Sequence, residues 1–389
     1  MNTLKYRPPL EIIKEFNEFT FTPKNTSEKI NFLLDNKFHC FPLYYNEGSF
    51  SAKEYFHVVS CLAEVCSTTA LSMSMHLYTV WGLSLLHKHR VNGILGLIPD
   101  QNALFGSLNE PGLYFVSENN LNSEEYPVLA TKTSNGDGYI VSGIKHFVSL
   151  EPFVRFLPVY CLTEQEDGRK RLIALIVDKK MSGVSIRKDW NSMSMNETFS
   201  NSINFENVFV PNSLVLSDID QSISEFQAQR FLFRFNVASV YYGIAKKAID
   251  YIVDTSQKKK VPHTGRTLSF FPGVQYSLAE MMILLQTSAS QIYYCANLVD
   301  DYARGESSVS KELNSVSLIT KEYVIKSSEE IVNIAMKIEG ISSLSNTSLL
   351  SSLYKDVKAG LFHPPQSDVT MELLAKDKLG IISLRNRWF

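Results

Sequence analysis

One histidine near the end of the chain stands in a setting that suits proton transfer. His363 is followed by Pro364 and Pro365, which cannot continue a helix and which stiffen the backbone beside the imidazole. An imidazole has an ordinary pKa of ~6.5, so it changes between hydrogen-bond donor and acceptor close to neutral pH. The alternative is structural, because a histidine at the end of a helix expected over 346–359 is favoured by the helix dipole. Both interpretations of His363 stay open at this point.

The remaining histidines and the cysteines do not form a recognisable metal site. His87 and His89 lack a third ligand at a spacing typical of zinc, so the end of a surface helix is expected there. The cysteines are odd in number, scattered and mostly inside apolar runs, which is typical of buried reduced thiols and not of a disulfide framework. They are Cys40, Cys61, Cys66, Cys161 and Cys295.

The composition is that of a soluble globular enzyme. The 389 residues are 44% hydrophobic and 20% charged, and this length suits two or three packed domains. A net charge of −2 with one lysine run, 258–260, does not favour nucleic-acid binding. Residues 1–10 have no apolar signal-peptide core, and the longest apolar stretch, 70–86, contains His76 and several serines. We therefore expect a cytoplasmic protein with no membrane span.

The elements that would position His363 change in character along the chain. Residues 9–100 show the apolar spacing of helices. A helix is expected over 52–69, beginning after Ser51 as its N-cap, and a loop is expected over 41–51. The N-terminal part is therefore predicted to be helical.

Residues 104–214 have the alternation and the turn residues of strands. Asn135, Gly136, Asp137 and Gly138 form a tight hairpin signal between two such strands. Short strands joined by turns and flanked by helices predict a small antiparallel barrel or sandwich. The expected strands are 126–134, 139–148, 156–162, 172–178 and 202–210.

Helical periodicity returns after residue 223 and predicts a four-helix bundle. The expected helices are 226–255, 274–304, 310–339 and 346–359, with a last one over 367–379. The predicted fold class is α+β and mostly α. It has an N-terminal helical domain (1–102), a central antiparallel β-domain of the barrel or sandwich type (103–218) and a C-terminal four-helix bundle (219–389).

Segments in a shared order resemble the acyl-CoA dehydrogenase superfamily. Ser-Leu-Asn-Glu-Pro-Gly at 107–112 is similar to the family's loop ending in Thr-Glu-Pro-Gly. Residues 139–149 are similar to its Tyr-x-Leu-x-Gly-x-Lys-x-Trp-Ile-Thr strand. Further matches to the family's segments are 194–198, 205–211, Gly243 and 278–281. Each segment is weak alone, and the common order makes the resemblance a fairly strong signal.

The resemblance implies a flavin site in the β-domain, with FAD as the cofactor and FMN as the alternative. It implies that Phe147 lies against the flavin ring and that Ser149 hydrogen-bonds its reactive edge. It also implies that Leu108 and Asn109 donate hydrogen bonds from the preceding loop. The structural alternative is that Phe147 is an inward-facing strand residue with no ligand.

The family also takes cofactor contacts from a neighbouring subunit, which implies a homodimer or homotetramer. In the family an Arg and a Gln-x-x-x-Gly-Gly segment hold the pyrophosphate and adenine side. The corresponding segments here are 257–260 and 337–341. Lys337 and Gly340 are therefore candidate cofactor residues, although a lysine meets a phosphate as a point charge and not as a fork.

The family's catalytic base is missing from this sequence. A dehydrogenase removes a weakly acidic proton with a desolvated glutamate, and its two known positions hold Phe233 and Pro364 here. The family's CoA-contacting Ala-Gly-Ser-Asp is replaced by residues 113–116, Leu-Tyr-Phe-Val. Flavin monooxygenases of the superfamily carry His-Asp-Pro at the C-terminal position, with a histidine where His363 stands.

Three functions follow from this resemblance. The first is an FAD-dependent oxidoreductase acting on an acyl thioester, such as a CoA ester, or a related acyl compound, together with an electron-transfer partner. The second is a flavin-dependent monooxygenase that takes reduced flavin from a partner reductase and uses O2, with catalytic His363 at the flavin edge. The third is an inactive flavin-binding homologue, against which the retained flavin segments count. The first is the leading expectation.

Overall fold

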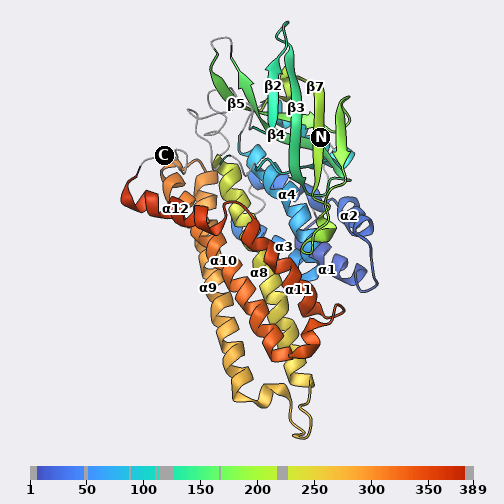
Figure 1. Ribbon diagram of the computed structural model, residues 1–389, viewed down its shortest axis with the longest axis vertical. Helices are drawn as coiled ribbons and strands as arrows, with labels where there is room; N and C mark the ends of the chain where they lie inside the picture. The colour runs from blue at the N-terminus through green and yellow to red at the C-terminus, as the bar shows by residue number, and fades with distance from the viewer. Residues whose placement is uncertain are drawn as a thin grey trace.

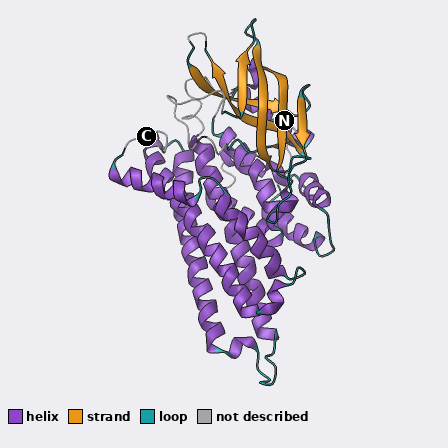
Figure 2. Ribbon diagram, viewed as in Figure 1, coloured by secondary structure: helices purple, strands orange, loops and turns teal. Residues whose placement is uncertain are grey.

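The structure is a computed structural model and describes residues 7–47, 51–86, 89–109, 113, 126–165, 168–216 and 227–381. A β-sheet lies at one end of an elongated molecule, and long helices extend away from it (Figures 1 and 2). The predicted α+β class, mostly helical, with a helical N-terminal part, a central sheet and a C-terminal bundle, is confirmed.

The N-terminal part consists of short helices and one long helix. The predicted N-cap is confirmed, because the Ser51 side chain accepts the Glu54 amide and the Glu54 carboxylate accepts the Ser51 amide. The predicted 52–69 helix is divided at Cys66, whose backbone is extended. The loop expected over 41–51 is instead largely a 3-10 helix, Phe38–Glu47. The α-helices are α1 (Pro9–Phe19), α2 (Thr26–Asp35), α3 (Ala52–Val65), α4 (Ser67–Ser84), α5 (His89–Leu95) and α6 (Leu97–Gln101).

Helix α4 is the buried helix that the long apolar stretch predicted. Nearly every residue of α4 is buried, since the helix lies beneath the sheet and against α8 (Gln227–Lys258) (Figure 1). Within the described part of the chain, no helix is long and apolar enough to cross a membrane.

Within the described ranges, seven strands form one sheet in the order β1-β4-β2-β3-β7-β6, and β5 pairs with β4. Most pairings are antiparallel, as predicted, but β1 and β2 run parallel to β4. The reason is geometric: β2 and β3 form a hairpin, β4 runs opposite to β3, and β4 then pairs beside β2. The strands are β1 (Leu104–Phe105), β2 (Val128–Lys132), β3 (Gly138–Val148), β4 (Val154–Glu164), β5 (Lys170–Asp178), β6 (Val184–Arg187) and β7 (Asn201–Pro211).

The C-terminal part is a bundle of long helices that packs along α8. Helices α10 (Ser310–Glu339) and α12 (Ser367–Leu379) have the predicted bounds. The others are α9 (Pro272–Ala303) and α11 (Leu349–Lys358), close to their predicted ranges. A polar cluster helps to fix α8 on α10, because the buried Arg234 donates to Asn314 and Ser317.

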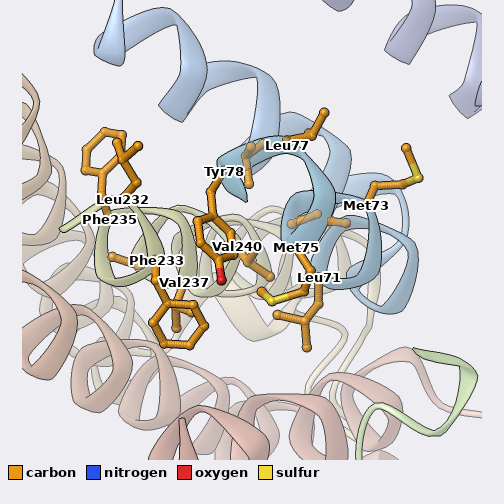
Figure 3. Close-up of a cluster of buried hydrophobic side chains, with 14 of the residues drawn as sticks. Leu71, Met73, Met75, Leu77, Tyr78, Leu232, Phe233, Phe235, Val237 and Val240 are labelled. Atoms are coloured by element: carbon orange, nitrogen blue, oxygen red, sulfur yellow. The ribbon is translucent and has the colours of Figure 1, made fainter. Parts of the chain in front are cut away.

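The contact between α4 and α8 forms the wall from which the site is built. Figure 3 shows apolar side chains of both helices meeting in one cluster, with Leu71, Met75 and Tyr78 from α4 and Phe233 from α8. The rings of Tyr78 and Phe233 meet edge to face at 5.5 Å between centroids. Packing of this kind fixes the direction of each side chain, so the wall is rigid.

Gly243 permits the close approach of α8 to α3. A Cβ at this position would lie 2.3 Å from the Ser60 carbonyl oxygen and 2.7 Å from the Ala63 Cβ. These are backbone and core atoms that cannot move freely, so the position requires glycine.

We predict that Gly243→Ala lowers the free energy of unfolding by about 1–3 kcal/mol, because the added methyl group overpacks the α3–α8 contact. Gly273→Ala on α9 is the matched control, since a Cβ there meets nothing within 4 Å. Urea unfolding of both variants measures the difference. Equal stability of the two variants would contradict the close-packing role of Gly243.

Candidate functional site

A cavity of about 580 Å³ opens where the sheet, α4, α8 and the segment after α11 meet. Its wall is mainly apolar, and apolar residues reach it from separate parts of the chain: Leu71, Met75, Phe233, Phe362 and Val369. Its polar groups come chiefly from the end of β3 and from the 190–200 connection. An apolar cavity of this size with a few converging polar groups is typical of a small-molecule site.

A bulge at the end of β3 brings Phe147 to the cavity. Lys145 pairs with Ile203 and Val148 pairs with Asn201, so two residues of β3 face one residue of β7. Phe147 has a φ of 57° and its side chain is 64% exposed, although it is an aromatic residue in a strand. The ring lines the cavity and meets Trp190 edge to face. The bulge therefore removes Phe147 from the core and offers its ring to a ligand.

Further residues around the cavity have a left-handed backbone conformation. Leu150 has a φ of 57°, Met195 of 51° and Phe199 of 46°. Such conformations are costly for residues with a Cβ, and they persist only where surrounding contacts hold them. Their concentration beside one cavity is typical of a functional site.

Three hydroxyl groups line the cavity beside Phe147. Ser149 Oγ lies 2.9 Å from Ser200 Oγ, which lies 2.8 Å from Thr198 Oγ1. Thr198 Oγ1 in turn donates to the Met195 carbonyl oxygen at 2.8 Å. The predicted residue Ser149 is therefore one end of a connected chain of hydrogen bonds.

The loop that follows β1 is held by side chains of α4. His76 Nδ1 accepts the Phe105 amide at 2.9 Å, and the Tyr78 hydroxyl bonds the Ser107 hydroxyl. The Ser107 hydroxyl accepts the Asn109 amide at 3.1 Å. Asn109 lines the cavity, whereas the Leu108 side chain is fully buried in a separate core cluster and does not line it. The following residues, 110–112, lie outside the described part.

His363 lines the cavity from the segment between α11 and α12. Its Nε2 lies 3.0 Å from the hydroxyl of Tyr241, a fully buried residue of α8. The structural alternative, a cap on the preceding helix, does not describe this contact, because the ring bonds Tyr241 and not a carbonyl of α11. Burial, and secondarily the nearby Lys321 ammonium, lowers the pKa of His363 to about 3, so the ring is neutral at pH 7.

The contact with Tyr241 fixes which nitrogen of His363 carries the proton. The hydroxyl of Tyr241 has no other hydrogen-bond partner among the described residues. If Nε2 carried the proton, the hydroxyl hydrogen of Tyr241 would be buried without an acceptor, at a cost of about 1–3 kcal/mol. The hydroxyl therefore donates to Nε2, and Nδ1 carries the proton. Nδ1 has no partner within the described ranges, so its N–H is available on the cavity wall.

A buried carboxylate joins the parts of the chain that surround the cavity. Asp356 of α11 accepts hydrogen bonds from the Ser67 hydroxyl at the start of α4 and from the Met195 amide. Burial raises the pKa of this carboxyl, against the effect of these two hydrogen bonds. Asp356 does not line the cavity and acts through the backbone that it holds.

Family models match two successive regions of the chain. Residues 115–208 match the middle domain of acyl-CoA dehydrogenase, and residues 228–379 match its C-terminal domain. Together the two matches span more than half of the chain. The chain belongs to the acyl-CoA dehydrogenase superfamily. It is thus a member of a class of flavin-dependent oxidoreductases.

The relatives found by sequence comparison share only a low identity with this chain. The chain is 26% identical over 283 residues to a 3-(aryl)acrylate reductase of Clostridium sporogenes, covering 73% of this chain and 70% of that protein. It is 24% identical over 279 residues to subunit CarC of the caffeyl-CoA reductase-Etf complex of Acetobacterium woodii, covering 72% and 69%.

Solved structures share the fold over almost the whole chain. FMN-bound TdsC from Paenibacillus sp. A11-2 has a TM-score of 0.82 at 17% identity and covers 96% of both chains. Butyryl-CoA dehydrogenase from Megasphaera elsdenii has a TM-score of 0.81 at 18% identity, covering 97% of this chain and all of its own. Methanesulfinate monooxygenase MsuC from Pseudomonas fluorescens has a TM-score of 0.80 at 18% identity and covers 97% of both chains.

The structure places the predicted site residues of this superfamily member in two regions. Asn109, Phe147, Ser149 and His363 line one cavity. Lys337 and Gly340 lie at the end of α10 that is far from the sheet (Figure 1) and do not line this cavity. Lys337 is 75% exposed in its side chain and 3.9 Å from Glu330. A cofactor role for Lys337 and Gly340 would require a second subunit, and it stays a prediction of the resemblance.

Sequence reasoning did not find several of the cavity's polar residues. Thr198 is the last residue of the segment 194–198 that carried part of the family resemblance, and Ser200 follows two residues later, so that segment was the available signal. No sequence pattern marked Tyr241 as a site residue, because a tyrosine inside an apolar helix is ordinarily a core residue. Its contact with His363 joins residues 122 positions apart.

We predict that stability falls as the pH drops below about 6.5, because buried histidines are neutral in the folded chain and take up protons when the chain unfolds. Burial lowers the pKa of His76 to about 3 and that of His39 to about 4. Between those values and the unfolded pKa, the unfolded chain binds more protons, so each residue costs stability on the order of 2 kcal/mol at about pH 5.

His76→Gln should therefore flatten this dependence, since glutamine does not titrate. Urea unfolding at about pH 5 and about pH 7.5 measures it for both proteins. The interpretation fails if the variant loses as much stability between the two pH values as the original chain.

Proposed function

We propose that this chain is a flavin-dependent monooxygenase that binds reduced flavin supplied by a partner reductase and oxygenates a small apolar substrate with O2. The observation that carries the proposal is the cavity wall itself. Phe233 and Pro364 stand at the two positions where the family's dehydrogenases carry their base, and both line the cavity. No aspartate or glutamate is among the described residues that line it. Proton abstraction from an acyl thioester therefore lacks a carboxylate base among the lining residues that the structure describes.

The residues around the cavity fit a flavin ring. The exposed Phe147 ring offers an apolar planar partner, and Ser149 offers a polar atom two residues later. A volume of about 580 Å³ accommodates the ring together with a small substrate. Asn109 would hold the ring from the opposite loop, and we take FAD as the cofactor, with FMN as the alternative. The related structures of TdsC and KijD3 are complexes with FMN.

The chemistry of the flavin is simple to state in overall terms. Bound reduced flavin would supply the two electrons with which one atom of O2 enters the substrate and the other leaves as water. The chain itself excludes bulk water with Leu71, Met75 and Phe233, which close the inner wall. It then provides polar groups at fixed positions.

His363 would act as a neutral hydrogen-bond donor and not as a base. The Tyr241 hydroxyl occupies Nε2, so Nδ1–H would remain to donate to the cavity contents. A buried imidazole with a pKa of about 3 takes up a proton poorly, but it donates a hydrogen bond to developing negative charge without reorganisation. Lys321 holds this segment in place by donating to the Pro365 carbonyl oxygen at 2.7 Å.

A second candidate function is supported by the relatives. Oxidation or reduction of an acyl compound, with an electron-transfer flavoprotein as partner, fits the names of the arylacrylate reductase and of the caffeyl-CoA reductase-Etf subunit. It requires an acid or base from elsewhere in the assembly. A catalytically inactive homologue is disfavoured by the strained residues that remain around the cavity.

One experiment separates these functions. The purified protein is supplied with FMN or FAD, a flavin reductase and NADH, and product is sought with indole as an apolar probe under isotopically labelled O2. In parallel, the flavin-loaded protein is mixed with butyryl-CoA without oxygen. Label in the product with no bleaching by butyryl-CoA supports monooxygenation, whereas bleaching of oxidised flavin by the thioester would overturn it.

His363→Ala is predicted to lower the rate of product formation by about 100-fold or more, because a donor to developing charge is lost. His363→Asn should retain more activity than His363→Gln, since the asparagine amide N–H replaces Nδ1–H and the glutamine amide replaces Nε2. Steady-state rates and melting temperatures of the three variants measure this. A large loss of stability with a normal rate would restore a purely structural role.

Lys337→Ala is predicted to weaken FAD binding about fivefold, equivalent to ~1 kcal/mol for an exposed ion pair, and to leave FMN binding unchanged. The reason is that Lys337 would meet the pyrophosphate of a neighbouring subunit's FAD. Lys311→Ala, an exposed lysine at the other end of α10, is the matched control. Fluorescence titration measures both affinities, and an equal effect of the two variants on FAD would remove Lys337 from the site.

A further inference from the structure

The hydroxyl chain beside Phe147 has only one consistent direction of donation. The Met195 carbonyl oxygen can only accept, so the hydrogen of Thr198 Oγ1 lies between these two oxygens at 2.8 Å. Thr198 then has no hydrogen left for Ser200, and the 2.8 Å contact requires the Ser200 hydroxyl to donate. By the same count, Ser149 must donate to Ser200 across 2.9 Å.

The end of this chain at the cavity is therefore an oxygen without a free hydrogen. Ser149 uses its single hydrogen on Ser200 and keeps lone pairs for the cavity. For Ser149 to donate outward, its hydrogen must leave Ser200, which places lone pairs of both oxygens against each other and breaks a buried hydrogen bond. Such a change is unfavourable in a low-dielectric site.

The inner end of the chain is fixed by the surrounding structure. Thr198 is 1% exposed and Ser200 is 8% exposed, so water does not compete for their hydroxyl groups. The Met195 carbonyl oxygen also accepts the Thr198 amide at 3.1 Å. The Met195 amide is held by Asp356 at 3.0 Å. The direction of donation is thus imposed by backbone that cannot turn.

We propose that Ser149 presents a hydrogen-bond acceptor to the cavity and thereby makes the site select reduced flavin over oxidised flavin. The inference rests on the proposed function, in which the reactive edge of the flavin lies at Ser149. At that edge the reduced ring carries an N–H, whereas the oxidised ring carries a lone pair on the same nitrogen. An acceptor oxygen forms a hydrogen bond with the first and repels the second.

This selectivity suits an enzyme that receives its flavin already reduced. Reduced flavin from a partner reductase would be retained, and oxidised flavin would be released after turnover and exchanged. A site with the opposite polarity, a hydroxyl donor at the same edge, would hold the oxidised form and release the reduced one.

Anaerobic calorimetric titration tests the proposal with oxidised FMN and with chemically reduced FMN as separate probes. The original chain should bind the reduced form roughly threefold to tenfold more tightly, the range expected for one hydrogen bond. Ser200→Ala releases the hydrogen of Ser149 for donation, so the ratio of the two dissociation constants should fall to about one or below. Thr198→Val should have the same effect, because Ser200 can then donate back to Ser149.

Two control variants should keep the original ratio. Thr198→Ser retains the donor to Met195, and Ser328→Ala removes a buried hydroxyl of α10 that bonds only its own helix. An original ratio near one, or an unchanged ratio in folded Ser200→Ala and Thr198→Val, overturns the selection while leaving flavin binding intact. No binding of FMN or of FAD, in either the oxidised or the reduced form, overturns both the selection and the proposed function.

Discussion

The site depends on the hydrogen bonds that the carboxylate of Asp356 accepts. It belongs to α11 of the bundle, and it bonds Ser67 at the start of α4 and Met195 in the connection before β7. Bundle, N-terminal helices and sheet thus meet at one buried group. Burial raises the pKa of Asp356, so the carboxylate is held against desolvation by its hydrogen bonds. The cavity forms directly beside this junction, and its shape follows from these fixed positions.

From this junction the polarity of the cavity can be followed outward. Asp356 fixes the Met195 amide, and the Met195 carbonyl oxygen sets the direction of the three hydroxyl groups that end at Ser149. Elsewhere in the lining, the hydroxyl of the buried Tyr241 sets which nitrogen of His363 carries the proton. On this proposal Ser149 offers an acceptor to the cavity and His363 offers a donor. Both polarities depend on Asp356 and Tyr241, which do not line the cavity themselves, so a mainly apolar lining can still be specific.

The sequence predicted most elements because their signals are local. Helices α10 and α12 have apolar periodicity and clear ends, and their predicted bounds agree with the structure. The N-cap Ser51 was recognisable from Glu54 three residues later. The division of the 52–69 helix at Cys66 and the parallel pairing of β4 with β2 depend on tertiary packing. No local pattern encodes them.

The candidate site was predictable only in part, for the same reason. Phe147, Ser149, Asn109 and His363 were found through a resemblance and line one cavity. The direction of the hydroxyl chain depends on Thr198 and Ser200. Ser200 contacts Ser149 although the two residues are 51 positions apart in the sequence. The left-handed backbone of Phe147 follows from a bulge against β7, which a strand pattern does not reveal.

The most direct test is a crystal structure of the protein prepared without oxygen in the presence of reduced FMN. The flavin ring is expected against Phe147, with the N–H of its reactive edge at Ser149 Oγ and with His363 lining the same cavity. A ring bound elsewhere, or a carboxylate within hydrogen-bond reach of its reactive edge, would contradict the proposed oxygenation and favour proton abstraction from an acyl substrate.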